Sequence, residues 1–257
     1  MKKLFLTLMA VAAIMCISCK KEPTPNKPDK PDDEGGNEEE PTYVQPITID
    51  GDFSDWAKLD ASKVAVAKGN ANALFTIPKE IRVYADELYV FFYLEYDNAA
   101  MSEMLVEGEG LPIRLDFNTD GEFESGYHKY FKESYDFMVE GSVAENGQWA
   151  SFDGGFYQRF PDGWGDPALL AEGSGMCSGA GSGNKYEICL IREVFNAAAG
   201  ASAEPKLMGD EFQCGVTFYT PTWGELGALP NEAVNENSEN SEDLKGWGHM
   251  LTVTTVH

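Results

Sequence analysis

Basic residues are scarce in this sequence. Its 257 residues include 19 Lys and Arg against 43 Asp and Glu, which gives a formal net charge of −24. Such an acidic chain repels phosphate backbones and anionic lipid surfaces. This argues against nucleic acid as a partner and against adsorption of the folded part to a membrane. Hydrophobic residues still make up 43%, which is typical of a folded protein. Cations, neutral ligands such as sugars, and proteins remain as partner classes.

Recognisable catalytic motifs are missing as well. The sequence has three scattered histidines and no Gly-x-Ser-x-Gly, His-Glu-x-x-His or phosphate-loop motif. Its glycine-rich stretch, 173–183, is too irregular for a nucleotide-binding fingerprint and is expected to be a flexible loop. Acidic residues are so numerous that some pair spaced for glycoside hydrolysis is inevitable, so no pair is informative. We therefore predict a non-catalytic protein that binds no nucleotide, with a glycoside-active enzyme as an alternative.

Long apolar runs are limited to one, residues 4–17, which follows Lys2 and Lys3. It is shorter than the roughly 20 residues that a membrane-spanning helix needs, and it is typical of a secretory signal. The run ends in Ser18-Cys19, a small residue before a cysteine, which resembles the bacterial lipoprotein box. The resemblance implies that Cys19 is acylated and that a lipid anchor is the protein's only contact with the membrane.

The segment after the anchor is predicted to be a tether. Residues 20–46 contain five prolines between Pro23 and Pro41 and the acidic run Glu38–Glu40, a composition that favours an extended spacer. Because Lys20 follows the cysteine, the lipoprotein resemblance implies the outer membrane, at either its periplasmic or its cell-surface face. The organisation predicted is a signal peptide at 1–19, a tether at 20–46 and a single domain at 47–257. This domain carries 35 acidic and 13 basic residues, a net charge of −22.

Cysteine is also sparse. Of five cysteines, Cys16 leaves with the signal peptide and Cys19 is lipidated, which leaves Cys177, Cys189 and Cys214. Three is an odd number, so at least one thiol is free. We expect buried thiols that behave as small hydrophobic groups, with a Cys189–Cys214 disulfide as the alternative.

Short β-rich runs dominate the domain. In 87–96, Leu88, Val90, Phe92 and Leu94 alternate with aromatic residues, which predicts a central strand covered on both faces. The run 81–84 precedes it across a two-residue turn and predicts a hairpin. Further strands are expected at 47–50, 63–67, 111–117, 135–143, 149–152, 185–191, 212–219 and 250–256. Helices are expected only at 99–106 and 193–199, and 235–243 is expected to be a mobile loop. The fold predicted is an all-β antiparallel sandwich, of jelly-roll or immunoglobulin-like type.

Several motifs occur in an order that resembles the family 9 carbohydrate-binding-module-like (DOMON-like) domains. They are Ile49-Asp50-Gly51 with Asp55-Trp56, Val83–Val90, Leu115–Gly121 with Gly126-Tyr127, Tyr135–Gly141, and Lys185–Arg192, the last without the family's usual proline. The resemblance implies a sandwich that binds sugars or, in some members, haem. Haem would need an axial ligand such as His128 or Met138, but nothing in the sequence marks either residue, so we do not expect haem.

An acidic turn follows one of the predicted strands. Its oxygen-bearing residues are Asp116, Asn118, Asp120, Glu122 and Glu124, with Gly121 among them. Alternating oxygen ligands around a glycine suit Ca²⁺. Tyr127 stands where an EF-hand needs glutamate, so the loop is not an EF-hand. The alternative is an Asx-rich turn with no metal.

Tryptophan is the residue type on which we base the ligand hypothesis. Trp164 and Trp223 lie in Gly- and Pro-rich loops, Trp149 lies in a predicted strand, and all three are candidates for stacking on a sugar ring. Trp56 is expected in the core, and the role of Trp247 stays open. We thus hypothesise a lipid-anchored protein that binds a glycan or sugar, with glycan-uptake proteins as candidate partners. A structural or protein-interaction lipoprotein is the alternative.

Overall fold

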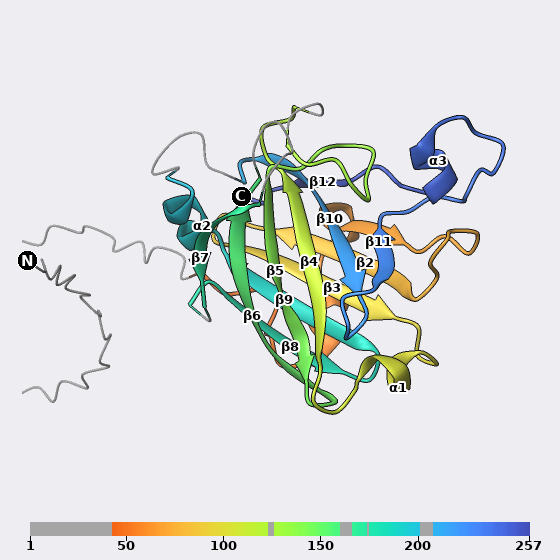
Figure 1. The fold of residues 1–257 in the computed structure, drawn as a ribbon. Helices are drawn as coiled ribbons and strands as arrows, with labels where there is room; N and C mark the ends of the chain where they lie inside the picture. Colours follow the sequence, from red (N-terminus) through yellow and green to blue (C-terminus); the bar gives the residue numbers. More distant parts are fainter. Residues whose placement is uncertain (1–42, 123–125, 160–165, 174, 201–207) are drawn as a thin grey trace, which may run out of the picture. The chain divides into compact units, whose positions relative to one another are not determined.

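Two antiparallel sheets lie face to face (Figure 1), which confirms the predicted all-β sandwich. The computed structural model describes residues 43–122, 126–159, 166–173, 175–200 and 208–257. Sheet one has the order β1 (Ala65–Lys68), β2 (Pro78–Ala85), β3 (Tyr89–Tyr96), β9 (Lys185–Ile191) and β8 (Cys177–Ser182). Sheet two has the order β11 (Glu225–Leu229), β10 (Glu211–Tyr219), β4 (Gly110–Asn118), β5 (Phe137–Glu145), β6 (Gln148–Gln158) and β7 (Ala168–Glu172), and β12 (Leu251–Thr254) also pairs with β10.

Helical segments are short. They are the α-helices α1 (Met101–Met104), α2 (Arg192–Ala198) and α3 (Ser241–Lys245) and the 3-10 helices η1 (Phe53–Ala57) and η2 (Ala61–Lys63). The first two α-helices fall at the predicted sites. The third begins inside the stretch 235–243 that the sequence predicted as a mobile loop, where the Asn240 side chain accepts a hydrogen bond from the N–H of Glu242.

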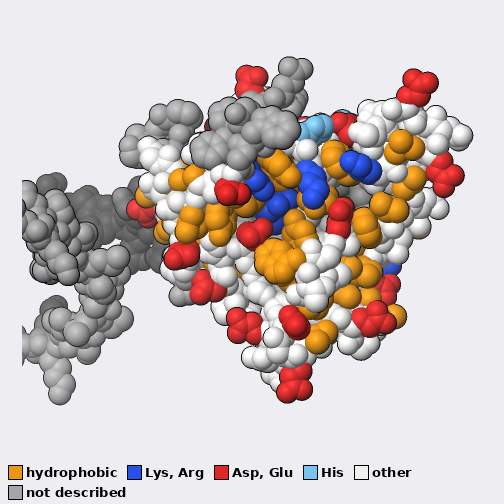
Figure 2. Space-filling model, in the orientation of Figure 1, with side chains coloured by type: hydrophobic (Ala, Val, Ile, Leu, Met, Phe, Trp, Pro, Cys, Tyr) orange, Lys and Arg blue, Asp and Glu red, His pale blue; other side chains and the backbone are white. Residues whose placement is uncertain are grey.

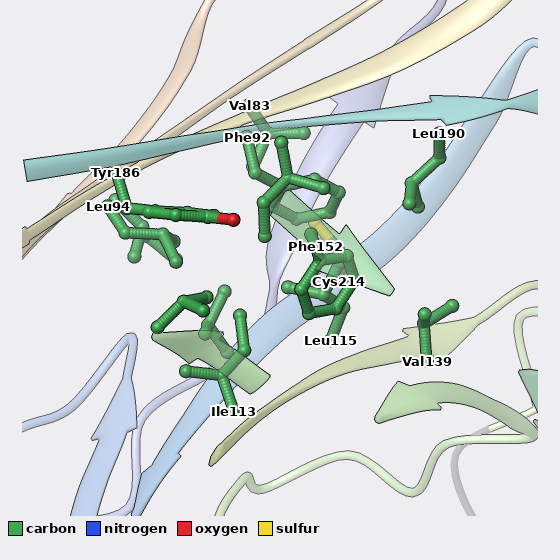
Figure 3. Close-up of a cluster of buried hydrophobic side chains, with 14 of the residues drawn as sticks. Val83, Phe92, Leu94, Ile113, Leu115, Val139, Phe152, Tyr186, Leu190 and Cys214 are labelled. Carbon is green, nitrogen blue, oxygen red and sulfur yellow. The ribbon is translucent and has the colours of Figure 1, made fainter. Parts of the chain in front are cut away.

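Strand β3 is central and covered on both faces, as its alternation predicts. Val90, Phe92 and Leu94 point between the sheets, whereas Phe91 and Tyr93 pack on the opposite side of sheet one. The main core lies between the two sheets, where side chains of β2, β3 and β9 meet those of β4, β5, β6 and β10 (Figure 3). The predicted hairpin is also present, with Ala85 of β2 opposite Val90 of β3.

Two predictions made from local sequence are wrong. Residues 47–50 form no strand, although the Ile47 side chain is fully buried against the outer side of sheet one. The glycine-rich stretch contains β8, which pairs with β9 along its whole length. A Cβ atom at Gly179 would lie 2.4 Å from the Tyr186 hydroxyl, and one at Gly181 would lie 2.6 Å from the Trp149 ring. The glycines therefore make room for aromatic rings that pack over an edge strand. Strands β7 and β11 were not predicted.

All three cysteines that the structure describes are free and buried, which confirms the expectation of buried thiols. Cys177 and Cys214 belong to the main core, whereas Cys189 points to the outer side of sheet one. A Cys189–Cys214 disulfide is thus excluded by the fold, because Cys214 of sheet two points into the core between the sheets whereas Cys189 of sheet one points away from it.

A buried carboxylate attaches the start of the domain to sheet one. Glu187 of β9 is fully buried, and its Oε1 accepts hydrogen bonds from the N–H groups of Asp50 (3.0 Å) and Gly51 (2.9 Å). Its Oε2 accepts one from Nε1 of Trp56 (3.2 Å), a side chain that is 4% exposed and packs on Tyr93. Trp56 is therefore a core residue, as predicted. The motif around Asp50 and Trp56 is explained by this attachment: three donors converge on one carboxylate.

We predict that Glu187→Ala lowers the free energy of unfolding by about 3 kcal/mol, because it leaves three donors without their acceptor. Glu187→Gln keeps the shape but not the charge and should cost less, about 1–2 kcal/mol. Urea denaturation measures both, with Glu211→Gln on the exposed end of β10 as the control. A Glu187→Ala protein within about 0.5 kcal/mol of wild type, the range of ordinary surface changes, would contradict the structural role.

Candidate functional site

A row of polar residues lies on the outer face of sheet two. Arg114, Asp116 and Asn118 alternate along β4 with side chains that enter the core, yet all three are buried. Arg114 Nε donates to Oδ1 of Asp116 (2.7 Å), and the Thr217 hydroxyl of neighbouring β10 donates to Oδ2 (2.7 Å). Burial opposes the charge on Arg114, but the Asp116 carboxylate outweighs it and holds the pKa of the guanidinium above its usual value.

Aromatic rings cover this ion pair. The Arg114 guanidinium lies over the rings of Tyr130, Tyr135 and Tyr219, with its carbon 5.5, 5.4 and 5.8 Å from their centroids. Tyr130 and Tyr135 come from the loop between β4 and β5, and they form a third buried cluster with Phe131, Ala228 and Met250. The loop can approach because β10 has a glycine there: a Cβ atom at Gly215 would lie 2.3 Å from the Phe131 ring.

Four rings in succession form what we call the aromatic strip: Trp223, Tyr219, Tyr130 and Trp247. The centroid of Trp223 lies 5.6 Å from that of Tyr219, Tyr219 lies 6.5 Å from Tyr130, and Tyr130 lies 6.5 Å from Trp247. Exposure differs along the strip. Tyr130 and Tyr219 are buried, Trp247 is partly exposed and Trp223 is 55% exposed. The strip therefore offers solvent one indole at each end.

The turn that carries Trp223 is held in a costly conformation. Trp223 has φ of 64° and Tyr130 has φ of 79°, values that L-residues other than glycine, asparagine and aspartate rarely adopt. The N–H of Trp223 donates to the Thr220 carbonyl (2.9 Å), and the N–H of Gly224 donates to the Thr220 hydroxyl (2.8 Å). These bonds fix the turn, and the Trp223 ring that it carries stays mostly in solvent. Strain of this kind, of order 1–3 kcal/mol, concentrates at functional sites.

Two hollows flank the strip. One has a volume of about 220 Å³ and is lined by Trp247 and Tyr130 together with Leu74, Phe75, Lys129, Glu225 and Lys245; we call it the lysine pocket. The other, of about 340 Å³, is lined by Trp223 and Pro221 together with Glu109, Pro112, Glu140 and Ser142. Figure 2 shows Lys and Arg side chains gathered in the middle of one face, next to hydrophobic side chains and with acidic side chains around them.

The three tryptophans predicted to bind sugar have different surroundings. Trp223 is the exposed end of the strip. Trp149 is half-buried against Tyr96 and Tyr186 at the edge of the main core, and its Nε1 donates to the Gly183 carbonyl (3.1 Å). Trp164 lies outside the described residues, as does the predicted lipidation site Cys19. The structure therefore favours Trp223 over Trp149 as a ligand contact.

The residues predicted to bind calcium are largely engaged in hydrogen bonds within the protein. Both carboxylate oxygens of Asp116 accept hydrogen bonds on the outer face of sheet two, from Arg114 of β4 and Thr217 of β10. Asn118 Oδ1 accepts from the N–H of Gly121 (3.0 Å), and Asp120 Oδ1 accepts from the N–H of Glu122 (2.8 Å). This is the hydrogen bonding of Asx turns, the alternative interpretation of the loop. Glu124 lies outside the described residues, and within them no three His, Cys, Asp or Glu residues are grouped to hold a metal ion. Calcium binding stays a prediction.

Residues that would have to ligate haem also have protein contacts. His128 Nε2 lies 3.1 Å from Oε1 of Glu242, and the His128 ring packs on Trp247. Met138 is 2% exposed.

Sequence reasoning did not find most of the site. Tyr130, Tyr219, Lys129 and Lys245 were not singled out, and Trp247 was left without a role. The one sequence feature that points toward the site is the pair of glycines on either side of Trp247. One of them, Gly246, caps the C-terminal end of α3 with φ of 67°.

Comparison with known proteins adds no family. No protein-family model matches the chain, and no curated protein is similar to it. In the part of the chain that the structure describes, no helix is long and apolar enough to span a membrane.

A melting experiment tests the calcium prediction. Binding to the loop would raise the melting temperature in excess CaCl₂ over that in chelator, by about 2–4 °C for each kcal/mol by which the bound ion stabilises the folded state. The double variant Asp120→Asn/Glu122→Gln removes two exposed carboxylates and should abolish the rise. Equal melting temperatures of the wild type in calcium and chelator would show that the loop is an Asx turn without a metal.

Proposed function

We propose that this protein is a lipid-anchored, non-catalytic carbohydrate-binding protein of the cell envelope, and that the aromatic strip is its glycan-binding surface. The observation that carries the proposal is Trp223, an indole 55% exposed on a hydrogen-bonded turn with a left-handed backbone conformation. Its exposure and strain are not accounted for by packing. They are accounted for if the ring is held ready for a ligand.

Sugar rings suit such a surface. A pyranose presents an apolar C–H face that stacks on an indole and hydroxyl groups that need polar partners. The hollow beside Trp223 supplies the carboxylates of Glu109 and Glu140 and the hydroxyl of Ser142. The lysine pocket offers Trp247 with charged side chains around it at the other end. The arrangement fits an extended chain of sugars better than a single ring, because an indole is available at both ends of the strip.

The order of the sequence motifs agrees with this proposal, since the domains they resemble are sandwiches that bind sugars. The N-terminal sequence supports a location in the cell envelope. The secretory run ending at Ser18-Cys19 would supply the lipid anchor, and the acidic, Pro-rich tether would hold the domain at a distance from the outer membrane. Partner proteins for glycan uptake fit the same setting.

We predict that Trp223→Ala weakens glycan binding at least tenfold, or about 1.4 kcal/mol, because an exposed aromatic anchor is lost. A glycan array identifies the ligand, and calorimetry compares the variants. Leu88→Ala is the matched control, since Leu88 is also an exposed large apolar side chain, 45% exposed, but lies at the turn between β2 and β3. Trp164→Ala is measured in parallel and is expected to weaken binding too.

Two results would count against the proposal. An array on which the wild type binds no glycan would overturn it. Binding that is equally strong in wild type, Trp223→Ala and Leu88→Ala would remove the strip as the binding surface.

Acylation of Cys19 is tested in cells. We predict that the wild type incorporates labelled palmitate and sediments with the outer membrane, whereas Cys19→Ala does neither, because the thiol is the acylation site. Cys177→Ala, a core thiol, is the control and should keep the label. Label retained by Cys19→Ala would contradict the anchor.

A further inference from the structure

The lysine pocket has a charge opposite to that of the domain. Its two ammonium groups belong to Lys129, which follows His128 in the β4–β5 loop, and Lys245, the last residue of α3. Lys129 Nζ lies 4.4 Å from the centroid of Tyr130, and Lys245 Nζ lies 4.6 Å from that of Trp247. Each cation is thus held over a ring that belongs to both the pocket and the strip.

Neither lysine forms an ion pair with any residue that the structure describes. Lys63 and Lys185 also have none within the described residues, so the distinguishing feature is that Lys129 and Lys245 line one pocket. Three acids of the neighbouring segments are engaged elsewhere: Lys132 lies 2.8 Å from Glu232 and 3.7 Å from Asp243, and His128 lies 3.1 Å from Glu242. By contrast, Lys58, Lys68 and Lys79 on sheet one and its leading segment each have an acidic partner within 4 Å. The pocket lysines are therefore free to meet an anion.

One acid, Glu225, also lines the pocket. With both lysines protonated, the lining keeps a net positive charge of one. Glu225 is exposed at the start of β11, where its carboxylate can accept a hydrogen bond from a ligand hydroxyl. The lining thus combines two cations for an anion, one acceptor for a hydroxyl and two rings for an apolar face.

The size of the pocket fits one ring. Its volume of about 220 Å³ exceeds the roughly 150 Å³ of an engineered protein cavity that holds benzene. Backbone geometry keeps the space open: Gly227 has φ of 100°, and a Cβ atom there would lie 2.8 Å from Phe75, which forms part of the wall. A single pyranose with one charged substituent has the dimensions and the chemistry that this lining complements.

We propose that the lysine pocket selects a sugar ring that carries an anionic substituent, a carboxylate or a sulfate, and that Lys129 and Lys245 bind this group. The inference rests on the proposed glycan-binding function and names the class of glycan. The ring stacks on Trp247 and the anion lies between the two ammonium groups. Lys129 and Lys245 are specificity-determining residues in this scheme, and Trp223 is a contact for the neutral part of the chain.

A glycan panel tests the inference. It is printed with uronate oligosaccharides and sulfated oligosaccharides, each beside a neutral counterpart: the methyl ester or the desulfated sugar. The wild type should bind one acidic class at least tenfold more tightly than its neutral counterpart, the gain expected of a charge-assisted contact. The carboxylate and sulfate arms decide which anion is recognised.

The double variant Lys129→Met/Lys245→Met removes both charges and keeps the apolar stems. It should lose the preference for the acidic sugar while its affinity for the neutral counterpart stays within about twofold of wild type. Lys63→Met is the matched control, because Lys63 is exposed, as Lys245 is, and also has no ion pair within the described residues. As an independent readout, the acidic sugar should slow acetylation of Lys129 and Lys245, followed by mass spectrometry, and leave acetylation of Lys63 unchanged. Melting curves verify that each variant is folded.

The outcomes separate this inference from the proposed function. Equal affinity for acidic and neutral counterparts, or acidic preference that survives in the double variant, overturns the inference and leaves glycan binding intact. Binding to no sugar on the panel or on the wider array overturns both.

Discussion

The buried ion pair between Arg114 and Asp116 is the interaction on which the outer face of sheet two depends. Both groups are at most 5% exposed, and a charge removed from water is tolerated only when it is paired and hydrogen-bonded. Asp116 meets that condition through Arg114 and Thr217. Arg114 in turn gives Tyr130, Tyr135 and Tyr219 a cation to pack against. An aromatic layer can therefore lie on a polar strand. Two of its rings, Tyr130 and Tyr219, are the middle members of the aromatic strip.

The two sheets close their outer faces in different ways. On sheet one, the segment from Ile47 to Trp56 lies across β3 and β9 and is attached at Glu187, so aromatic side chains there are used for packing. On sheet two, the β4–β5 loop covers only part of the face, and Trp223 and Trp247 reach solvent beside hollows. The same motif, a buried carboxylate that collects donors, thus supports a closed face on sheet one and a face with exposed indoles beside hollows on sheet two.

Sequence patterns predict the fold where side chains alternate by type. Val90 to Leu94 could be assigned to a two-sided central strand because both of its faces are apolar. Strand β8 was missed because its glycines, selected by the rings of Trp149 and Tyr186, look like those of a flexible loop. The site was missed for another reason. Tyr219 ends β10, whereas Tyr130 and Trp247 lie in two loops that meet through bridges of Phe131 to Gly248 and of Asn231 to Trp247, so only the tertiary fold brings the three rings into one row. The alternation along β4 places Asp116 beside Arg114 on the strand, a neighbour that a search for loop ligands does not consider.

The negative charge of the domain bears on which anions the lysine pocket would bind. A net charge of −22 repels polyanions at long range, so an anionic ligand is not drawn to this surface by the overall field. For an acidic sugar to bind, its short-range contacts with the ammonium groups of Lys129 and Lys245 and with the ring of Trp247 must offset that repulsion. Nucleic acid has the charge but not a pyranose face to stack, and it meets the repulsion of the surrounding acids without that compensation. Acidic surroundings around a small basic pocket therefore favour selectivity over affinity, because they penalise every anion except one whose ring and charge match the pocket together.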